Sequence, residues 1–121
     1  MTPLDSRRFP PYADIGYRYR VLIVIDREFQ RGFVKLYALW RAAKGEVYGV
    51  QIIEEMRVLG FRVSPGTLYP VLHTLLEERD VTVTERVVNG KVRKLYSATA
   101  KGREEAEEVV EKLSKLLKKF R

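Results

Sequence analysis

The residues with the most specific chemical pattern lie between positions 64 and 77, in a segment with helical spacing. At about 100° per residue, leucines form one apolar stripe, at Leu68, Leu72, Leu75 and Leu76. Small or polar residues occupy the other side, at Gly66, Thr67, Pro70, His73 and Thr74. A helix face of this kind, without net charge, suits close approach to base edges and to thymine methyl groups. The alternative is an ordinary surface helix.

The start of this segment has the residue types of a helix N-terminus. Ser64 is a predicted N-cap, and Pro65 stands in the first turn, where its missing N–H costs nothing. The free N–H groups of such a terminus favour contact with a phosphate. Tyr69 flanks the leucine stripe, so its ring can pack while its hydroxyl reaches a phosphate. His73, the single histidine of the chain, is either a donor to a base or phosphate or a plain surface side chain.

Basic residues gather in the segment 85–96, which carries only one acidic residue, Glu85. They are Arg86, Lys91, Arg93 and Lys94. Period-2 alternation on both sides of Asn89-Gly90 predicts a β-hairpin. Basic groups on a hairpin can follow the DNA backbone or enter the minor groove. The alternative is a solvated strand edge protected by lysines.

The composition restricts the classes of chemistry available to the chain. With no cysteine and one histidine among 121 residues, neither disulfides nor a cysteine- or histidine-rich metal site is expected. No phosphate-binding glycine loop and no nucleophile with a partner base is visible, so we expect no catalytic residues, no metal and no cofactor. The net charge of +7 favours a polyanionic partner, either nucleic acid or an anionic membrane surface. The longest apolar run, Val21 to Ile25, is too short to span a bilayer, and we expect a cytoplasmic protein.

Four helices are predicted around these groups. The first begins at Asp26 as N-cap and continues to about Ala43. The second covers Gly49 to Leu59, with Gly60 as its C-terminal stop. Its inward residues are expected to be Val50, Ile53 and Met56, and its outward residues Glu54, Glu55 and Arg57. The third begins at Ser64, and the fourth begins at Thr99 and continues to the C-terminus.

The remaining segments are strands and an N-terminal arm. Strands are predicted over 81–88 and 91–97, joined by the Asn89-Gly90 turn. Residues 1–25 read as an arm rich in proline near its start, with one further strand over 17–25. The expected fold class is therefore mainly α with a small β-hairpin, in the element order of a winged helix-turn-helix.

The last helix carries an apolar seam with heptad spacing. Its core positions are Ala106, Val110, Leu113, Leu117 and Phe120, widened by Val109 and Leu116. A seam of this length needs a long partner, and a second copy of the chain supplies one by symmetry. The alternative is a helix packed on its own domain. A membrane-surface role is disfavoured because the polar face mixes glutamate with lysine.

Three aromatic residues of the first helix form a further group. Phe33, Tyr37 and Trp40 recur at helical spacing and could line a ligand pocket near a dimer interface. Core packing is the commoner role of such a stripe.

Residues 32–102 resemble the PadR-like transcriptional regulators. The most specific match is the segment Ser64-Pro65-Gly66-Thr67-Leu68-Tyr69-Pro70. Further matches are Tyr48-Gly49, the positions Leu72, Leu75 and Glu77, the segment Arg93-Lys94-Leu95-Tyr96, and the pair Thr99 and Gly102. Three features depart from the family pattern: Asp80 replaces a usual glycine, the wing is short, and the arm before the first helix is long.

The resemblance implies a homodimeric DNA-binding regulator, commonly a repressor, that binds a palindromic operator. Its parts would be the arm (1–25), the winged helix-turn-helix domain (26–98) and a dimerisation helix (99–121). The expected DNA contacts are Tyr48, the outward residues of the third helix with Ser64 and Tyr69, and the four basic residues of the wing. A small aromatic effector is a further candidate partner, because some family members respond to one. The rival function is a winged helix that binds protein without specific DNA binding; RNA binding lacks the paired surface aromatics it needs.

Overall fold

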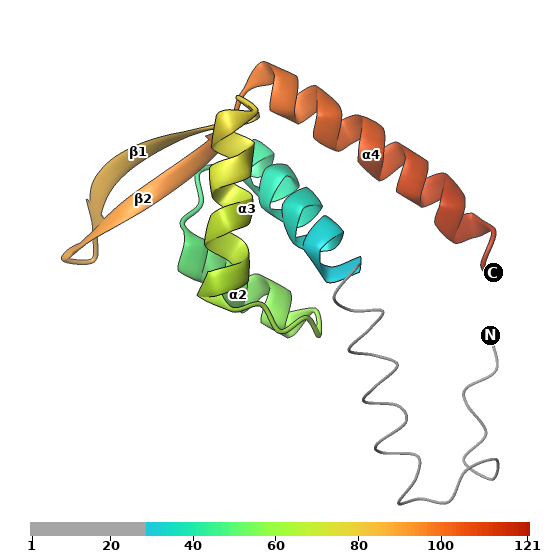
Figure 1. The fold of residues 1–121 in the computed structure, drawn as a ribbon, viewed down its shortest axis with the longest axis horizontal. Coiled ribbons are helices and arrows are strands. Elements are labelled where there is room, and N and C mark those ends of the chain that lie inside the picture. Colours follow the sequence, from blue (N-terminus) through green and yellow to red (C-terminus); the bar gives the residue numbers. More distant parts are fainter. Residues whose placement is uncertain (1–28) are drawn as a thin grey trace, which may run out of the picture.

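The structure is a computed structural model that describes residues 29–121. The arm over 1–25, its expected strand and the expected N-cap Asp26 lie outside the described residues. Within the described part, the order of elements is helix 29–44, α2, α3, β1, β2 and α4 (Figure 1). The prediction of a mainly α fold with one small hairpin is confirmed.

Helix 29–44 supplies one wall of the core. Its fully buried residues include Val34, Ala38 and Ala42, which are spaced four apart and so lie on one helical face. Small residues at two of these positions let neighbouring helices approach closely.

Helix α2 (Gly49–Val58) begins where predicted and ends one residue earlier, and part of its inward face differs from the prediction. Its buried residues are Gly49, Ile52 and Met56, whereas Val50 is 49% exposed and Ile53 is only partly buried. Met56 is therefore inward as predicted, whereas Ile52 takes the place that was expected for Ile53, and Val50 faces outward. Beyond the helix, Gly60 adopts φ of 96°, which confirms its role as the C-terminal stop.

Helix α3 (Pro65–Glu77) has the caps that the sequence predicts at its start. Ser64 Oγ accepts a hydrogen bond from the backbone N–H of Thr67 at 3.3 Å, and Pro65 occupies the first turn. Leu68, Leu72 and Leu75 are buried. The helix is followed by Arg79 in the left-handed region, with φ of 61°. The Asp80 N–H then bonds the carbonyl of Leu75 at 2.9 Å, which closes a Schellman motif.

Strands β1 (Val81–Val88) and β2 (Lys91–Ala98) form an antiparallel hairpin. Asn89 and Gly90 both have positive φ, 51° and 78°, as a two-residue type I′ turn requires. On its other edge, β2 pairs with Val47, two residues before the first residue of α2. Val47 and Tyr96 exchange backbone hydrogen bonds of 3.1 and 2.8 Å. This bridge attaches the hairpin to the start of α2.

Helix α4 (Ala100–Lys118) begins at Thr99, whose side chain accepts the N–H of Gly102 at 3.0 Å. The beginning of this helix lies directly on the turn after α3. A Cβ added at Gly102 would stand 2.0 Å from the carbonyl oxygen of Asp80, so only glycine allows this approach. Lys101 crosses the same junction and pairs with the buried carboxylate of Asp80 at 3.0 Å.

The core lies where the three helices of the winged domain meet the base of the hairpin. Ile52, Leu68 and Leu72 are almost fully buried there, with Val81 from β1 and Ala106 from α4 beside them. The hairpin extends from this body on one side, and the C-terminal half of α4 extends away from it on another (Figure 1).

We predict that Gly102→Ala destabilises the protein by about 2 kcal/mol or more, because the added methyl group collides with backbone rather than with a flexible side chain. Chemical denaturation followed by circular dichroism measures this loss. Gly32→Ala is the matched control. Gly32 lies within helix 29–44 with no neighbour within 4 Å of an added Cβ, so this change should stabilise by about 0.5–1 kcal/mol. Equal effects of the two substitutions would contradict the close contact.

Candidate nucleic-acid interface

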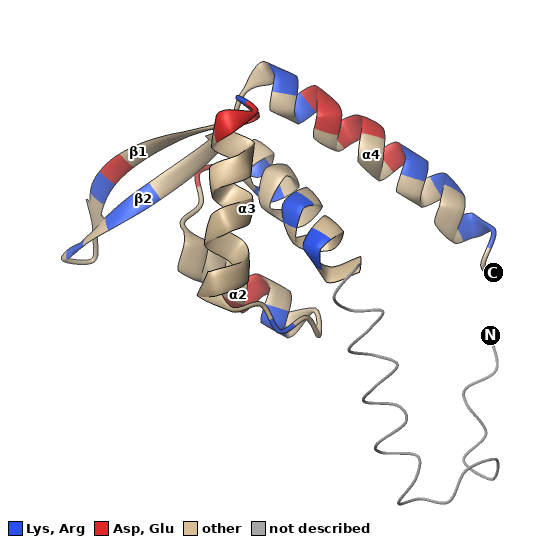
Figure 2. Ribbon diagram, in the orientation of Figure 1, with Lys and Arg blue, Asp and Glu red and all other residues tan. Residues whose placement is uncertain are grey.

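The side of α3 that faces away from the core carries the residues singled out from the sequence. Gly66, Pro70 and His73 are exposed, and Thr67 and Thr74 are partly exposed. The helix has no lysine or arginine, and its first acidic residue is Glu77 at its end. Figure 2 shows this helix without charge along most of its length. The surface is therefore free for contacts by small and polar groups.

Several polar atoms of this surface already have partners in the protein. Thr74 Oγ1 donates to the carbonyl of Pro70 at 3.1 Å. His73 Nε2 lies 2.8 Å from a carboxylate oxygen of Glu77, one turn further along the helix. Ser64 lies at the N-cap, where its hydroxyl is engaged with Thr67. Thr67 stands at the third helical position and is partly exposed beside Arg57 and Arg62.

The basic residues of the hairpin occupy different environments. Lys91 is exposed at the turn, and Lys94 lies opposite Glu85 in the register of the two strands. Arg86 forms an ion pair with Glu46, the residue just before the bridge to β2. Glu46 was missed by the sequence analysis because its partner is distant along the chain. The charge of Arg86 is therefore partly neutralised in the protein, unlike that of Lys91.

Tyr48, Tyr69 and Arg93 meet at the start of α2. The bridge between Val47 and Tyr96 places Tyr48 beside β2, and the Arg93 guanidinium lies 4.8 Å from the centre of the Tyr48 ring. The Tyr69 ring comes from α3 and covers Gly49. A Cβ added at Gly49 would lie 2.6 Å from the Tyr69 hydroxyl oxygen. These contacts explain why tyrosine and glycine stand at positions 48 and 49, which the sequence alone did not reveal.

The expected dimerisation seam of α4 is covered at one end only. Ala106 is buried against the core. Further along, Leu113 is half-buried, and Val109, Val110, Leu116, Leu117 and Phe120 are exposed, the last by 71%. An apolar stripe left open over the distal half of a helix is typical of an interaction surface.

The three aromatic residues of helix 29–44 do not line one pocket together. Phe33 packs against Phe61, with ring centres 5.9 Å apart. Tyr37 and Trp40 lie 5.9 Å apart and line an open groove of about 520 Å³ with Val58 and Leu59 at the end of α2. Phe33 is not among the residues of that groove.

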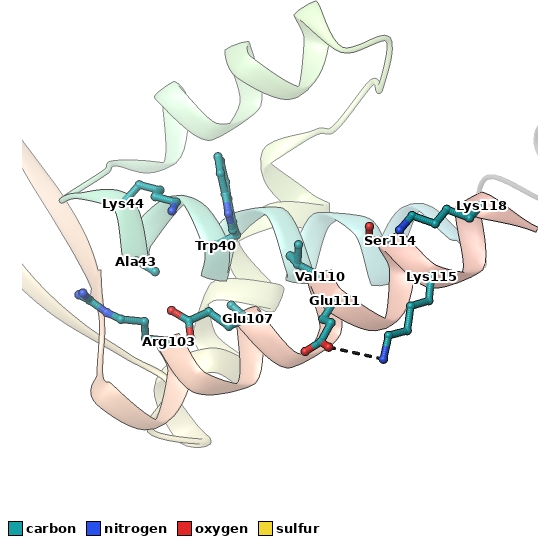
Figure 3. Close-up of a pocket in the computed structure, with 11 residues that line it drawn as sticks. Trp40, Ala43, Lys44, Arg103, Glu107, Val110, Glu111, Ser114, Lys115 and Lys118 are labelled. Atoms are coloured by element: carbon teal, nitrogen blue, oxygen red, sulfur yellow. Dashed lines mark ion pairs between the residues drawn. The ribbon is translucent and has the colours of Figure 1, made fainter.

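Trp40 also lines a second groove, of about 620 Å³, between helix 29–44 and α4 (Figure 3). On the α4 side this groove is lined by Val110 and by side chains of both charges, among them the 3.5 Å ion pair between Glu111 and Lys115. The Lys44 ammonium lies 5.4 Å from the centre of the Trp40 ring. The indole is therefore within reach of both grooves.

A hydrogen-bonded group joins helix 29–44 to α2. Tyr37 donates its hydroxyl to Glu55 at 2.6 Å, and Arg41 pairs with the same carboxylate at 3.0 Å. Glu55, expected to point outward, is thus half-buried because it has two partners on the neighbouring helix. Burial raises the pKa of Tyr37 to about 12, and the hydrogen bond to Glu55 adds to this shift.

Two further observations concern metal binding and membrane-spanning helices. In the part of the chain from 29 to 121, no group of three acidic or imidazole side chains is arranged to hold a metal ion. None of the helices in the same range is long and apolar enough to cross a membrane.

Comparison with known proteins decides the family. The model of the PadR-like family of transcriptional regulators matches residues 36–108, which is more than half of the chain. The protein belongs to the PadR-like family of transcriptional regulators. The transcriptional regulator Rv3488 of Mycobacterium tuberculosis is 48% identical to it over 77 residues, which are 64% of this chain and 72% of that protein.

Solved structures of PadR-like regulators have the same fold. A PadR-like transcriptional regulator from Bacillus cereus superposes with a TM-score of 0.70 at 27% identity, over 77% of this chain and 92% of the other. A PadR family regulator from Eggerthella lenta has a TM-score of 0.66 at 21% identity, over 84% and 86% of the two chains. The winged helix-turn-helix predicted from the element order is thereby confirmed.

We predict that Tyr37→Phe lowers the free energy of unfolding by about 1–2 kcal/mol at neutral pH, because Glu55 loses a hydrogen bond. The raised pKa also makes wild-type stability depend on alkaline pH. The unfolded chain loses the phenolic proton near pH 10, whereas the folded protein keeps it until about pH 12. The contribution of this group is therefore complete below about pH 10 and is lost as the pH rises toward 12. Urea unfolding at several pH values should show a shallower alkaline decline for the variant, and identical slopes would contradict the assignment.

Proposed function

We propose that this protein is a sequence-specific regulator of transcription that binds double-stranded DNA as a homodimer, and that it acts as a repressor. The observation that carries the proposal is the uncharged outward surface of α3, which stands between a basic hairpin and a helix with an open apolar seam. Residues 26–98 would bind DNA, and residues 99–121 would hold two copies together. The cytoplasmic location expected from the sequence rests on this role.

In this proposal α3 enters the major groove. Its outward residues are small enough to let the backbone come close to base edges, and Thr67 and Thr74 offer methyl groups that can contact thymine. The lack of basic residues on α3 leaves the electrostatic part of the affinity to other elements. Lys91 and Lys94 of the hairpin would supply it through backbone phosphates, with a strong dependence on salt.

The homodimer is supported by the exposed seam of α4 and by its charges. Residues 104–111 carry five glutamates, and residues 112–121 carry five basic residues and no acidic one (Figure 2). Two such helices attract each other most strongly when they run antiparallel, because each acidic half then lies beside a basic half. A twofold axis between them would relate two copies of α3, which explains why a palindromic operator is expected.

A small aromatic effector remains part of the proposal as a second ligand. The grooves on the two sides of Trp40 have the volume of small-molecule sites, and the indole offers a flat surface for stacking. The groove beside α4 would connect such a ligand to dimerisation. Phe33 has no part in either groove.

We predict that Thr67→Glu reduces affinity for the operator at least about a hundredfold while leaving stability unchanged. A carboxylate at this position would stand among phosphates and would block close approach. Within the protein it is well placed, since glutamate three residues after the Ser64 N-cap completes a capping box. Fluorescence anisotropy with a duplex recovered by selection from a random pool measures affinity, and thermal unfolding measures stability.

The matched control is Thr82→Glu, which makes the same chemical change at an exposed position of β1, paired with Ser97 near the α4 end of the hairpin. Its affinity should stay within about threefold of wild type. If Thr67→Glu binds the selected duplex as tightly as wild type, α3 does not contact the bases. The rival function, binding of protein through this helix, would then be preferred.

We predict that Leu117→Asp converts the dimer into a monomer without loss of helix content. Leu117 is 59% exposed in one copy, so the monomer tolerates a charge there, whereas a buried interface does not. Light scattering measures the molar mass. Ala100→Asp, which adds the same charge at an exposed position of the first turn of α4 and outside the seam, is the control and should remain a dimer. A dimer of unchanged stability for Leu117→Asp would place the interface elsewhere.

A further inference from the structure

A small cavity lies at the point where three elements of the proposed DNA-binding surface meet. It has a volume of about 180 Å³ and lies between the start of α2, the Tyr69 ring of α3 and strand β2. Tyr48 and Gly49 line it, and Arg93 and Lys94 contribute the cationic groups. No acidic residue lines it, so two positive charges share the cavity without a carboxylate.

Arg93 is held in this cavity before any ligand binds. Its guanidinium lies over the Tyr48 ring at 4.8 Å, a stacking arrangement that restricts the side chain. Its Nε is buried and has no hydrogen-bond partner among the described residues. A buried donor without an acceptor is costly, and a small shift of the Arg93 side chain would let an anion in the cavity supply the missing acceptor. The cross-strand neighbour Arg86 differs, because Glu46 already satisfies it.

The opposite wall offers neutral donors. The first N–H groups of α2, at Gly49 and Val50, have no carbonyl of their own helix to bond. The Tyr69 hydroxyl reaches the same place, because Gly49 has no Cβ to block it. Tyr69 remains 43% exposed, so the cavity is open to a ligand on the side of α3. An arginine fork, an ammonium, a phenol and backbone N–H groups together make a donor set for a phosphate group.

We propose that this cavity binds one phosphodiester group of the DNA backbone beside each half-site. This inference rests on the proposed function and adds to it a fixed anchor for α3. The anchor connects Tyr69 on the helix that contacts bases with Arg93 on the wing. A phosphate held by both elements would determine how far α3 turns in the groove. Tyr48 is a positioning residue here, since it acts by holding Arg93.

The test pairs protein variants with duplexes in which single phosphates are replaced by neutral methylphosphonates. With the wild-type protein, a methylphosphonate at one position in each half-site should reduce affinity by about tenfold, more than at the other positions. Arg93→Gln should bind the unmodified duplex about tenfold more weakly than the wild type does. A methylphosphonate at the identified position should then weaken binding of this variant by less than about twofold more. Such non-additivity assigns the phosphate to Arg93. Tyr48→Phe keeps the ring and should bind as wild type, whereas Tyr48→Leu and Gly49→Ala should each weaken the same contact.

Lys91→Gln is the matched control, because it removes one charge from the same hairpin outside the cavity. The loss in affinity caused by Lys91→Gln should multiply with the loss caused by the methylphosphonate at the position assigned to Arg93. Arg93→Gln and each methylphosphonate could instead weaken binding by factors that simply multiply at every position, while the wild type binds its operator. In that case the cavity is not a phosphate site, and the proposed function stands. Failure of the wild type to bind any duplex would overturn both proposals.

A competition experiment distinguishes a phosphate of the DNA backbone from free phosphate as the ligand of the cavity. Inorganic phosphate should displace the duplex no more than about twofold better than chloride at equal ionic strength. Stronger displacement that depends on Arg93 would assign the cavity to a free phosphate ligand and overturn its role as a DNA anchor.

Discussion

The contact between Gly102 and the carbonyl of Asp80 determines where the C-terminal helix can lie. Any side chain at Gly102 would collide with backbone, and Thr99 and Lys101 add hydrogen bonds to the same turn. Burial alone would raise the pKa of Asp80, but the hydrogen bonds of its carboxylate, that from Lys101 first among them, outweigh burial, and the pKa lies below its ordinary value. The end of α3, the start of β1 and the start of α4 are therefore joined at one point. Under the proposed function, this joint sets the distance between the two copies of α3 in a dimer.

The distribution of charge separates the tasks of the elements. The net charge of +7 is not spread evenly, since α3 has no basic residue while the hairpin and the end of α4 carry several. An uncharged α3 suits contacts that depend on base identity, and basic groups on the hairpin suit contacts that do not. On α4 the acidic and basic halves are separated along the helix, which favours pairing with an antiparallel copy. The family membership and the division of charge thus support the same account.

Much of the fold could be predicted because its signals are local. Ser64-Pro65, Asn89-Gly90 and Thr99 each specify a cap or a turn within a few residues, and the structure has all three where they were expected. Of the predicted inward face of α2, Met56 is buried, whereas Val50 is exposed and Ile53 is only partly buried. Val50 and Ile53 are as apolar as Ile52, and in a helix of ten residues the choice between two faces depends on packing against other elements. Local periodicity does not contain that information.

The parts of the site that escaped prediction depend on contacts between distant residues. The ion pair of Arg86 with Glu46 and the bridge of Val47 with Tyr96 join segments about 40 residues apart or more. From the residues alone, glycine at position 49 has no explanation beyond family resemblance, whereas the Tyr69 ring provides a steric one. The aromatic residues of helix 29–44 share a face but reach different neighbours along its length. Side-chain types are visible in a sequence, but their partners are a property of the fold.

The spacing of half-sites in duplexes selected from a random pool tests the central claim most directly. A dimer that inserts two copies of α3 into successive major grooves must contact DNA at points about 34–36 Å apart. The account predicts that the recovered duplexes share an inverted repeat whose half-sites are about 10 base pairs apart, centre to centre. Recovery of duplexes without a common repeat, or equal binding to all sequences at physiological salt, would contradict it.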